Sequence, residues 1–203
     1  MVGNDVVDLA DQETAGGATH PRFDERVFAP EERAWLGRSR PEERLRWVLW
    51  AAKESAFKAL KKLDPREIFS PRRLVVRLET GNAGSVRYGE RLFSVGVKIE
   101  RGACHAVTWV DLDPRAIVVS GMRRLRADVA EEPRSAARAF AIHLLAPLLG
   151  ASERDLAVVS ERRVPRLHLA GRPTPVDLSL SHHGQFVAFA CALGSEIISR
   201  FAA

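Results

Sequence analysis

The chain has 203 residues, 46% of them hydrophobic, so it can bury a sizeable core as one large domain or as two small packed units. No run of about 18 apolar residues occurs, which argues against a membrane span. The start MVGNDVVDLADQE carries acids where a signal peptide has a basic segment and an apolar run, so we expect a cytoplasmic protein. The formal net charge of +5 favours acidic partners or phosphate-rich ligands.

The chain has two cysteines, Cys104 and Cys191, and they are far apart in the sequence. No partner spacing suggests a zinc site around either of them. Both lie in apolar runs with a strand pattern, so we expect two reduced, buried thiols and no disulfide.

The first segments predict a strand, a loop and two helix starts. Residues 2–9, VGNDVVDL, are typical of a short buried strand, in which Asp5 can either cap a neighbouring group or ligate a metal. Residues 10–21 have loop composition. Pro30, followed by two glutamates, marks a helix start, and Ser39 to Glu42 has the spacing of a capping box that begins a second helix.

The helical segment at residues 47–63 has two different faces. An apolar stripe that we assign to the core repeats at helical spacing: Leu45, Leu49, Ala52, Ala56, Ala59 and Leu63. A mixed face that we interpret as the wall of an active site lies about half a turn away: Trp47, Trp50, Glu54, Phe57, Lys58 and Lys61. The simpler alternative is that Glu54 and Lys58 form a surface ion pair at i,i+4 spacing.

Alternating strand patterns follow the helix, at residues 72–79, 84–89, 92–100 and 105–112, and predict an antiparallel meander packed on it. The order then repeats, with a helix at 135–150 and strands at 155–161, 165–171 and 176–193. We therefore predict an α+β fold of two similar units with antiparallel sheets, an intramolecular pseudo-dimer of residues 1–113 and 114–203.

The two closing hairpins can be overlaid, with Ile99-Glu100 opposite Ser181-His182. Each half has kept different polar residues, which favours one composite site between the halves. The turn LSLSHHGQ does not have the further ligands of a zinc site, and adjacent strand residues point apart, which argues against a Ser-His nucleophile pair. A polar turn that binds an anion fits better.

Five segments resemble the motifs of the 4′-phosphopantetheinyl transferase superfamily: GNDVVDL, RFDERVFAPEE, WAAKESAFKA, GRP and LSLSHHGQFVAFA. The motif order resembles the small holo-acyl-carrier-protein synthases. The length and two-unit organisation resemble the pseudo-dimeric surfactin-synthetase-activating type, with the halves in permuted order. A composite site survives such a permutation, because it depends on how the halves pack.

The resemblance implies a Mg²⁺-dependent transfer of 4′-phosphopantetheine from coenzyme A to a carrier-protein serine, with release of adenosine 3′,5′-bisphosphate. It assigns Mg²⁺ to Asp5 and Glu54 and a phosphate contact to Lys58, and these three residues form the catalytic set. It leaves open whether Glu54 or a water on the metal deprotonates the serine. The remaining implied residues are Arg138, Arg172, Ser181 and His182 for coenzyme A, and Arg22, Phe23 and Arg26 for the carrier. Lys53, a cation close to Glu54, is added to the coenzyme A set.

Two positions depart from the family pattern. Val7 stands where the pseudo-dimeric enzymes have a second acid, and His183 replaces a Ser or Thr. The missing acid motivates an alternative, a catalytically silent pseudo-dimer that binds a carrier protein. The basic charge and four tryptophans motivate another, a nucleic-acid-binding module, but no nucleic-acid motif accompanies them. We expect a monomer whose partners are coenzyme A and a carrier protein, with no nucleic acid and no membrane.

Overall fold

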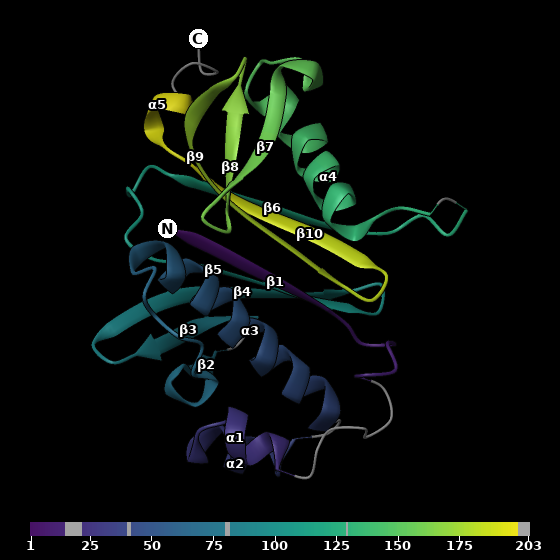
Figure 1. The fold of residues 1–203 in the computed structure, drawn as a ribbon. Helices are drawn as coiled ribbons and strands as arrows, with labels where there is room; N and C mark the ends of the chain where they lie inside the picture. Colours follow the sequence, from purple (N-terminus) through teal and green to yellow (C-terminus); the bar gives the residue numbers. More distant parts are fainter. Residues whose placement is uncertain (15–21, 40–41, 80–81, 129, 199–203) are drawn as a thin grey trace.

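The computed structural model describes residues 1–14, 22–39, 42–79, 82–128 and 130–198. Within these residues, two five-stranded antiparallel sheets lie one above the other, each with a long helix packed on it (Figure 1). The first sheet has the order β1-β5-β4-β3-β2, with β1 (Val2–Asp8), β2 (Val75–Leu78), β3 (Ala83–Tyr88), β4 (Arg91–Glu100) and β5 (Ala103–Trp109). The second has the order β6-β10-β9-β8-β7, with β6 (Ile117–Arg124), β7 (Leu156–Glu161), β8 (Val164–Leu169), β9 (Arg172–His183) and β10 (Phe186–Leu193).

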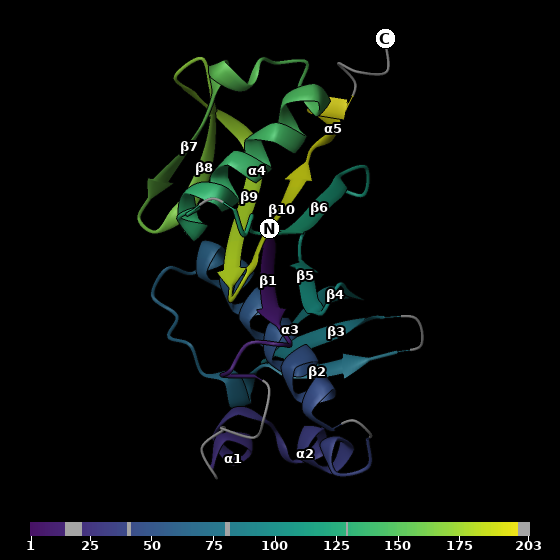
Figure 2. The same cartoon turned by 90° about the vertical axis from the view of Figure 1, so that its right-hand side faces the viewer.

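The long helices are α3 (Glu42–Leu63) in the N-terminal unit and α4 (Pro133–Leu148) in the C-terminal unit. At the start of α4, the Glu132 side chain accepts hydrogen bonds from two backbone N–H groups of the first turn. The short elements are α1 (Phe23–Val27), α2 (Pro30–Leu36) and α5 (Ser195–Ile198), with single 3₁₀ turns η1 (Pro71–Arg73) and η2 (Glu153–Asp155). Figure 2 shows α1 and α2 at the far end of the N-terminal unit, away from the second sheet.

The predicted repeat is confirmed by the topology. Each unit begins with a strand, continues with a long helix and ends with four strands, and the strand order is the same in both sheets. The predicted overlay is wrong by one residue. Both closing hairpins turn through two residues, after Glu100 and after His183, so Glu100 corresponds to His183 and Ile99 to His182. The boundary after residue 113 stays a prediction and lies between β5 and β6, which belong to different sheets.

Strand β6 is absent from the sequence-based prediction. It is an edge strand whose side chains are partly or fully exposed, so its residues do not show the alternation of a half-buried strand. The predicted helix at 135–150 is α4, and Pro147 falls in its last turn. The predicted start of α3 at Ser39 adjoins residues 40–41, which lie outside the described residues, so the capping box remains a prediction.

The apolar stripe of α3 is core, as predicted, and its alanines let the helix lie close to β1. Leu49, Ala52, Ala56 and Ala59 are fully buried. At Gly3, a Cβ atom would lie 2.0 Å from the backbone oxygen of Ser55 in α3. Only glycine therefore permits this approach, which brings the charged residues of β1 and α3 together.

The two units meet across β1, which packs against β9 and β10 of the second sheet. Two small apolar clusters fill this junction, one around Val2 and Ala190 and the other around Val6 and Phe186. Cys104 and Cys191 are buried free thiols, as predicted, and burial raises the pKa of each to about 12. None of the helices among the described residues is both long and apolar enough to cross a membrane.

Candidate active site

Asp5, Glu54 and Lys58 lie together where β1 crosses α3. Lys58 Nζ is 2.8 Å from Asp5 Oδ1 and 2.9 Å from the backbone oxygen of Asn4. Glu54, one helical turn before Lys58, makes no hydrogen bond or ion pair with a described residue. Burial raises the pKa of Glu54 to about 7, the negative charge of Asp5 adds to this, and Lys58 opposes it.

This donor set fits a hard divalent cation. Two neighbouring carboxylates, one of them unpartnered, destabilise each other's charge, and a cation between them would relieve this. Val7 lies on the same face of β1 as Asp5, but it is packed in the apolar core of the N-terminal unit, is 2% exposed and offers no ligand atom. The site therefore offers two carboxylates, and water and phosphate oxygens would have to complete the coordination.

A basic cavity of about 200 Å³ lies in the C-terminal unit, between α4 and strands β7 to β9. Its polar lining includes three predicted residues, Arg138, Ser181 and His182. Burial lowers the pKa of His182, and the positive charge of Arg134 lowers it further. The cavity suits an anion because its charged side chains are cations.

Two cavity arginines are absent from the sequence-based assignment. Arg134 is in the first turn of α4 and Arg163 is in the β7–β8 turn, and both line the cavity. Neither lies in a motif, so no local signal identifies them. Arg163 also lines a crevice of about 160 Å³ that continues towards α3, where Phe57, Lys58 and Lys61 form the opposite wall.

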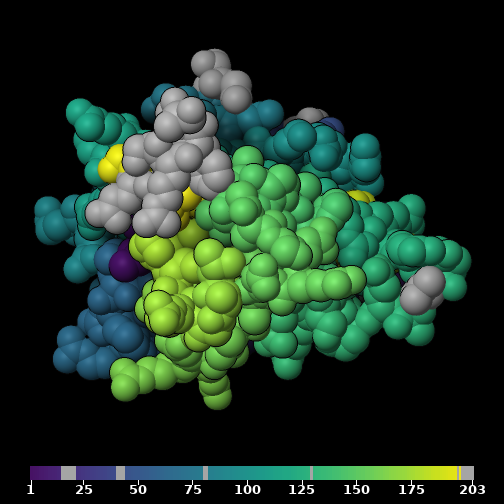
Figure 3. Space-filling view, turned by 90° about the horizontal axis from the view of Figure 1, so that it is seen from above, coloured from purple at the N-terminus to yellow at the C-terminus, as the bar shows by residue number. Residues whose placement is uncertain are grey.

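Asn4 links the Asp5, Glu54 and Lys58 group of the N-terminal unit to the basic cavity of the C-terminal unit. Its backbone N–H donates to Ser179 Oγ at 3.0 Å, and its side-chain nitrogen donates to Ser181 Oγ at 2.9 Å. Asp5 is the next residue and faces α3 on the other side of β1, where it contacts Lys58, and its negative charge also acts on His182 of the second unit. Figure 3 views the molecule from above, where the green to yellow C-terminal unit covers most of the face and blue N-terminal-unit residues lie at one side.

Two predicted coenzyme A contacts do not belong to this site. Lys53 is fully buried and ion-pairs with Glu32 at 2.6 Å, and its ammonium group also donates to the backbone oxygens of Pro71 and Leu74. Arg172 begins β9, a 12-residue strand in which Ser181 and His182 are at the other end. At about 3.3 Å per residue, roughly 30 Å separates Arg172 from Ser181.

Two aromatic residues of the mixed α3 face, Trp47 and Trp50, pack in an aromatic cluster and do not line the cavity or the crevice, whereas Phe57 does line the crevice. The Phe23 ring packs on Trp47 and Trp50, at centroid distances of 5.7 Å and 5.5 Å. Trp50 also contacts Phe69 edge to face. Phe23, predicted to contact the carrier, is therefore partly buried in this cluster, whereas Arg22 and Arg26 beside it are exposed.

The hairpin of β9 and β10, which has His182 and His183 at the end of β9, is hydrogen-bonded to the end of β1. The backbone N–H of Asp8 donates to His183 Nδ1 at 3.2 Å, and the Asp8 carboxylate accepts from the Gln185 N–H at 3.0 Å. Gly184 has a φ of 52°, and a Cβ there would lie 2.5 Å from Asp8 Oδ2, so this turn requires glycine. His183 thus holds the hairpin in place.

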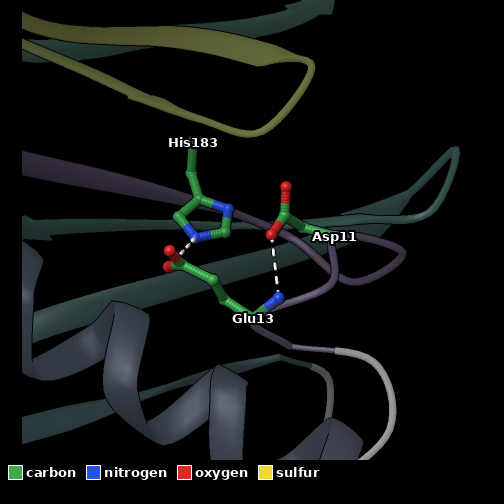
Figure 4. Close-up of side chains that lie close together, drawn as sticks. All are labelled: Asp11, Glu13 and His183. Atoms are coloured by element: carbon green, nitrogen blue, oxygen red, sulfur yellow. Dashed lines mark hydrogen bonds and ion pairs between the residues drawn. The ribbon is translucent and has the colours of Figure 1, made fainter. Parts of the chain in front are cut away.

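Figure 4 shows a group formed by Asp11, Glu13 and His183, the one cluster of three potential metal ligands found among the described residues. His183 Nε2 lies 4.0 Å from Glu13 Oε2. Because Nδ1 accepts a hydrogen bond, the neutral ring carries its proton on Nε2, which leaves no lone pair there for a metal. The group is better explained as part of the hairpin's attachment.

Comparison with known proteins identifies the family of this chain. The family model described as the 4′-phosphopantetheinyl transferase superfamily matches residues 1–108, slightly more than half of the chain. Among solved structures, the Thermotoga maritima holo-[acyl-carrier-protein] synthase is similar with a TM-score of 0.43 and 15% identity, over 90% of this chain and 98% of that chain, a likeness too weak to bear on function. Among curated proteins, none matches. The chain belongs to the 4′-phosphopantetheinyl transferase superfamily.

Proposed function

We propose that this protein transfers 4′-phosphopantetheine from coenzyme A to a carrier-protein serine, with Mg²⁺, as a cytoplasmic monomer. One observation carries the proposal. Asn4 connects Ser181 in a basic cavity of one unit to the Asp5, Glu54 and Lys58 group of the other. Each unit supplies half of what a nucleotide diphosphate substrate requires, and a single chain contains both halves.

The cavity would hold the phosphorylated adenosine end of coenzyme A. Arg134, Arg138 and Arg163 supply positive charge, while Ser181 and His182 supply hydrogen-bonding groups. The pantetheine arm would lie in the crevice lined by Phe57 and Lys61. In this proposal the diphosphate would lie between the cavity and the carboxylates.

Asp5 and Glu54 would hold the Mg²⁺ ion, which when bound supplies positive charge that stabilises the transferring phosphoryl group. Lys58 adds a second positive charge on the same side. The carrier serine attacks the β-phosphate, and adenosine 3′,5′-bisphosphate leaves. Either Glu54 or a water on the Mg²⁺ ion would accept the serine proton.

The test is to incubate the protein with coenzyme A, Mg²⁺ and a panel of apo carrier proteins and to weigh the products by mass spectrometry. Fatty-acid, polyketide and peptide-synthase carriers belong in the panel, since the sequence does not choose among them. We expect one carrier to gain a phosphopantetheine group, and chelation of Mg²⁺ to abolish this. Carrier binding without any mass gain would instead support the catalytically silent pseudo-dimer.

Two site variants and a control make the test specific. Asp5→Ala and Glu54→Gln should abolish labelling while the circular dichroism spectrum is retained. Asp64→Asn, a change at an acid that follows α3 and pairs with Arg66, should leave the rate unchanged. Full activity in either site variant would remove the proposed metal site.

Arg22, Phe23 and Arg26 remain proposed as the carrier-docking segment. Arg26 is exposed, so a charge reversal there should not disturb the core. Arg26→Glu should raise KM for an acidic carrier several-fold and leave KM for coenzyme A unchanged, because rim charges act mainly on encounter. Equal effects on both KM values would contradict a role of Arg26 in carrier docking.

A further inference from the structure

Asn4 is fully buried, and the two polar atoms of its side-chain amide have different surroundings. The nitrogen lies 2.9 Å from Ser181 Oγ and 3.1 Å from His105 Nε2. The oxygen Oδ1 is buried and has no hydrogen-bond partner among the described residues. A buried oxygen without a hydrogen-bond partner destabilises the folded protein, so this orientation of the amide needs an explanation.

His105 provides that explanation. Burial, together with the positive charges of Lys58 and Lys98, lowers the pKa of His105 to about 4, so the ring is neutral at neutral pH. A neutral imidazole with its proton on Nδ1 offers Nε2 as an acceptor. With the proton on Nδ1, Nε2 would accept from the Asn4 nitrogen at 3.1 Å and so keep the nitrogen, and not the oxygen, towards Ser181.

The orientation of the amide decides what Ser181 can do. A hydroxyl has one hydrogen to donate and two lone pairs that accept. Because Ser181 Oγ accepts from Asn4, its own hydrogen is available for another group, and Ser181 lines the cavity that contains Arg134 and Arg138. With the amide reversed, Oδ1 would take that hydrogen and turn the serine away from an anion.

We propose that Asn4, held by His105, is a positioning residue that fixes the Ser181 hydroxyl as a hydrogen-bond donor to the 3′-phosphate of coenzyme A. The inference rests on the proposed function, because it takes the cavity occupant to be the phosphorylated adenosine. Neither Asn4 nor His105 lines this cavity. Their effect is therefore transmitted through Ser181 and should depend on whether the ligand carries a 3′-phosphate.

The experiment compares coenzyme A with 3′-dephospho-coenzyme A by isothermal titration calorimetry, for wild-type protein and variants. Asn4→Ala should weaken coenzyme A binding about tenfold, the effect of one lost hydrogen bond to a charged group, and should leave 3′-dephospho-coenzyme A binding within about twofold. Ser181→Ala should give the same pattern, and the double variant Asn4→Ala/Ser181→Ala should be no worse than either single one.

Two further variants separate positioning from folding. His105→Leu removes the acceptor that holds the amide and should also lower the preference for coenzyme A, even if Asn4→Ala does not fold. Thr108→Val is the matched control, a buried polar group on the same strand as His105 whose hydroxyl contacts Ser55 and not Asn4, and it should keep the wild-type preference.

The outcomes are distinct. Unchanged preference in both Asn4→Ala and His105→Leu, or equal weakening of both ligands, would overturn the positioning role while carrier labelling by the wild-type protein still supported the transferase. If the wild-type protein bound neither ligand, the proposed function and this inference would both fail.

Discussion

Lys62 Nζ lies 2.6 Å from Asp177 Oδ1, so the last turn of α3 in the first unit is ion-paired with β9 in the second. The Lys62 side chain is 6% exposed and also donates to the backbone oxygens of Val2 and Leu178. A buried cation with three acceptors is costly to remove, because its partners are left without hydrogen bonds. This contact fixes how the two units meet.

We expect Lys62→Met to lower the free energy of unfolding by about 3 kcal/mol, since it leaves the partly buried Asp177 carboxylate without its cation. Urea unfolding monitored by tryptophan fluorescence measures the change. Adding Asp177→Asn should restore part of the loss. The exposed pair Arg66–Asp64 is the control, and Arg66→Ala should leave the free energy of unfolding nearly unchanged. Similar losses at both pairs would contradict the role of Lys62 at the junction.

Two lysines of α3 should behave in opposite ways. Lys53→Met should destabilise the protein by about 3 kcal/mol, because the Glu32 carboxylate would remain buried without its partner, and should affect transfer only through unfolding. Lys58→Met should abolish transfer and change stability little, since the Lys58 side chain is 31% exposed. Thermal melting and carrier labelling on the same samples test both statements, and a stable, inactive Lys53→Met would contradict them.

Glu54 should make stability depend on pH. The folded protein retains the Glu54 proton up to about pH 7, whereas the unfolded chain releases it near 4.5. Between these values the unfolded state holds fewer protons, so stability falls as pH rises, by at most roughly 3 kcal/mol from this group. Urea unfolding in a chelator should show this fall for the wild-type protein and a smaller one for Glu54→Gln.

Mg²⁺ should reverse this pH effect. A bound cation favours the ionised carboxylate, so added Mg²⁺ should stabilise the protein more at about pH 8 than at about pH 5. Thermal shift assays at both pH values measure the difference, with Glu54→Gln as the control that should show little of it. Equal Mg²⁺ stabilisation of the wild-type protein at both pH values would contradict an ion between Asp5 and Glu54.

In the β7–β8 turn, replacing Arg163 with glycine should raise stability and weaken ligand binding. Arg162 and Arg163 have φ values of 50° and 68°, in a two-residue hairpin turn where Asn-Gly is the favoured pair. Arg163→Gly should therefore raise the free energy of unfolding by about 1 kcal/mol. It should also weaken coenzyme A binding, because Arg163 lines the cavity. Arg162→Gly, changed at the neighbouring turn position outside this cavity, is the control that should stabilise the protein without the same loss of binding.

Much of the site could be predicted from local patterns, and the errors have physical causes. Asp5, Glu54 and Lys58 share one face of a strand and a helix, so their grouping follows from periodicity and from the packing of β1 on α3. Lys53 is next to Glu54 in the sequence, but α2 brings Glu32 against it, and no local pattern reports that contact. Arg172 matched a short motif, yet β9 is one continuous strand that separates it from Ser181.

The sequence by itself determined the α+β class, the repeat of helix and strands, and the family, because helical and strand periods and short motifs are properties of neighbouring residues. Only the tertiary structure decided which charged groups are buried partners and which face the cavity. Asn4 shows the difference: in the sequence it is one polar residue in an apolar strand, and its contacts are with Ser181, 177 positions away, and His105, 101 positions away. The contact with Ser181 depends on how the two sheets pack and the contact with His105 on the pairing of β1 with β5, and neither can be read from neighbouring residues in the sequence.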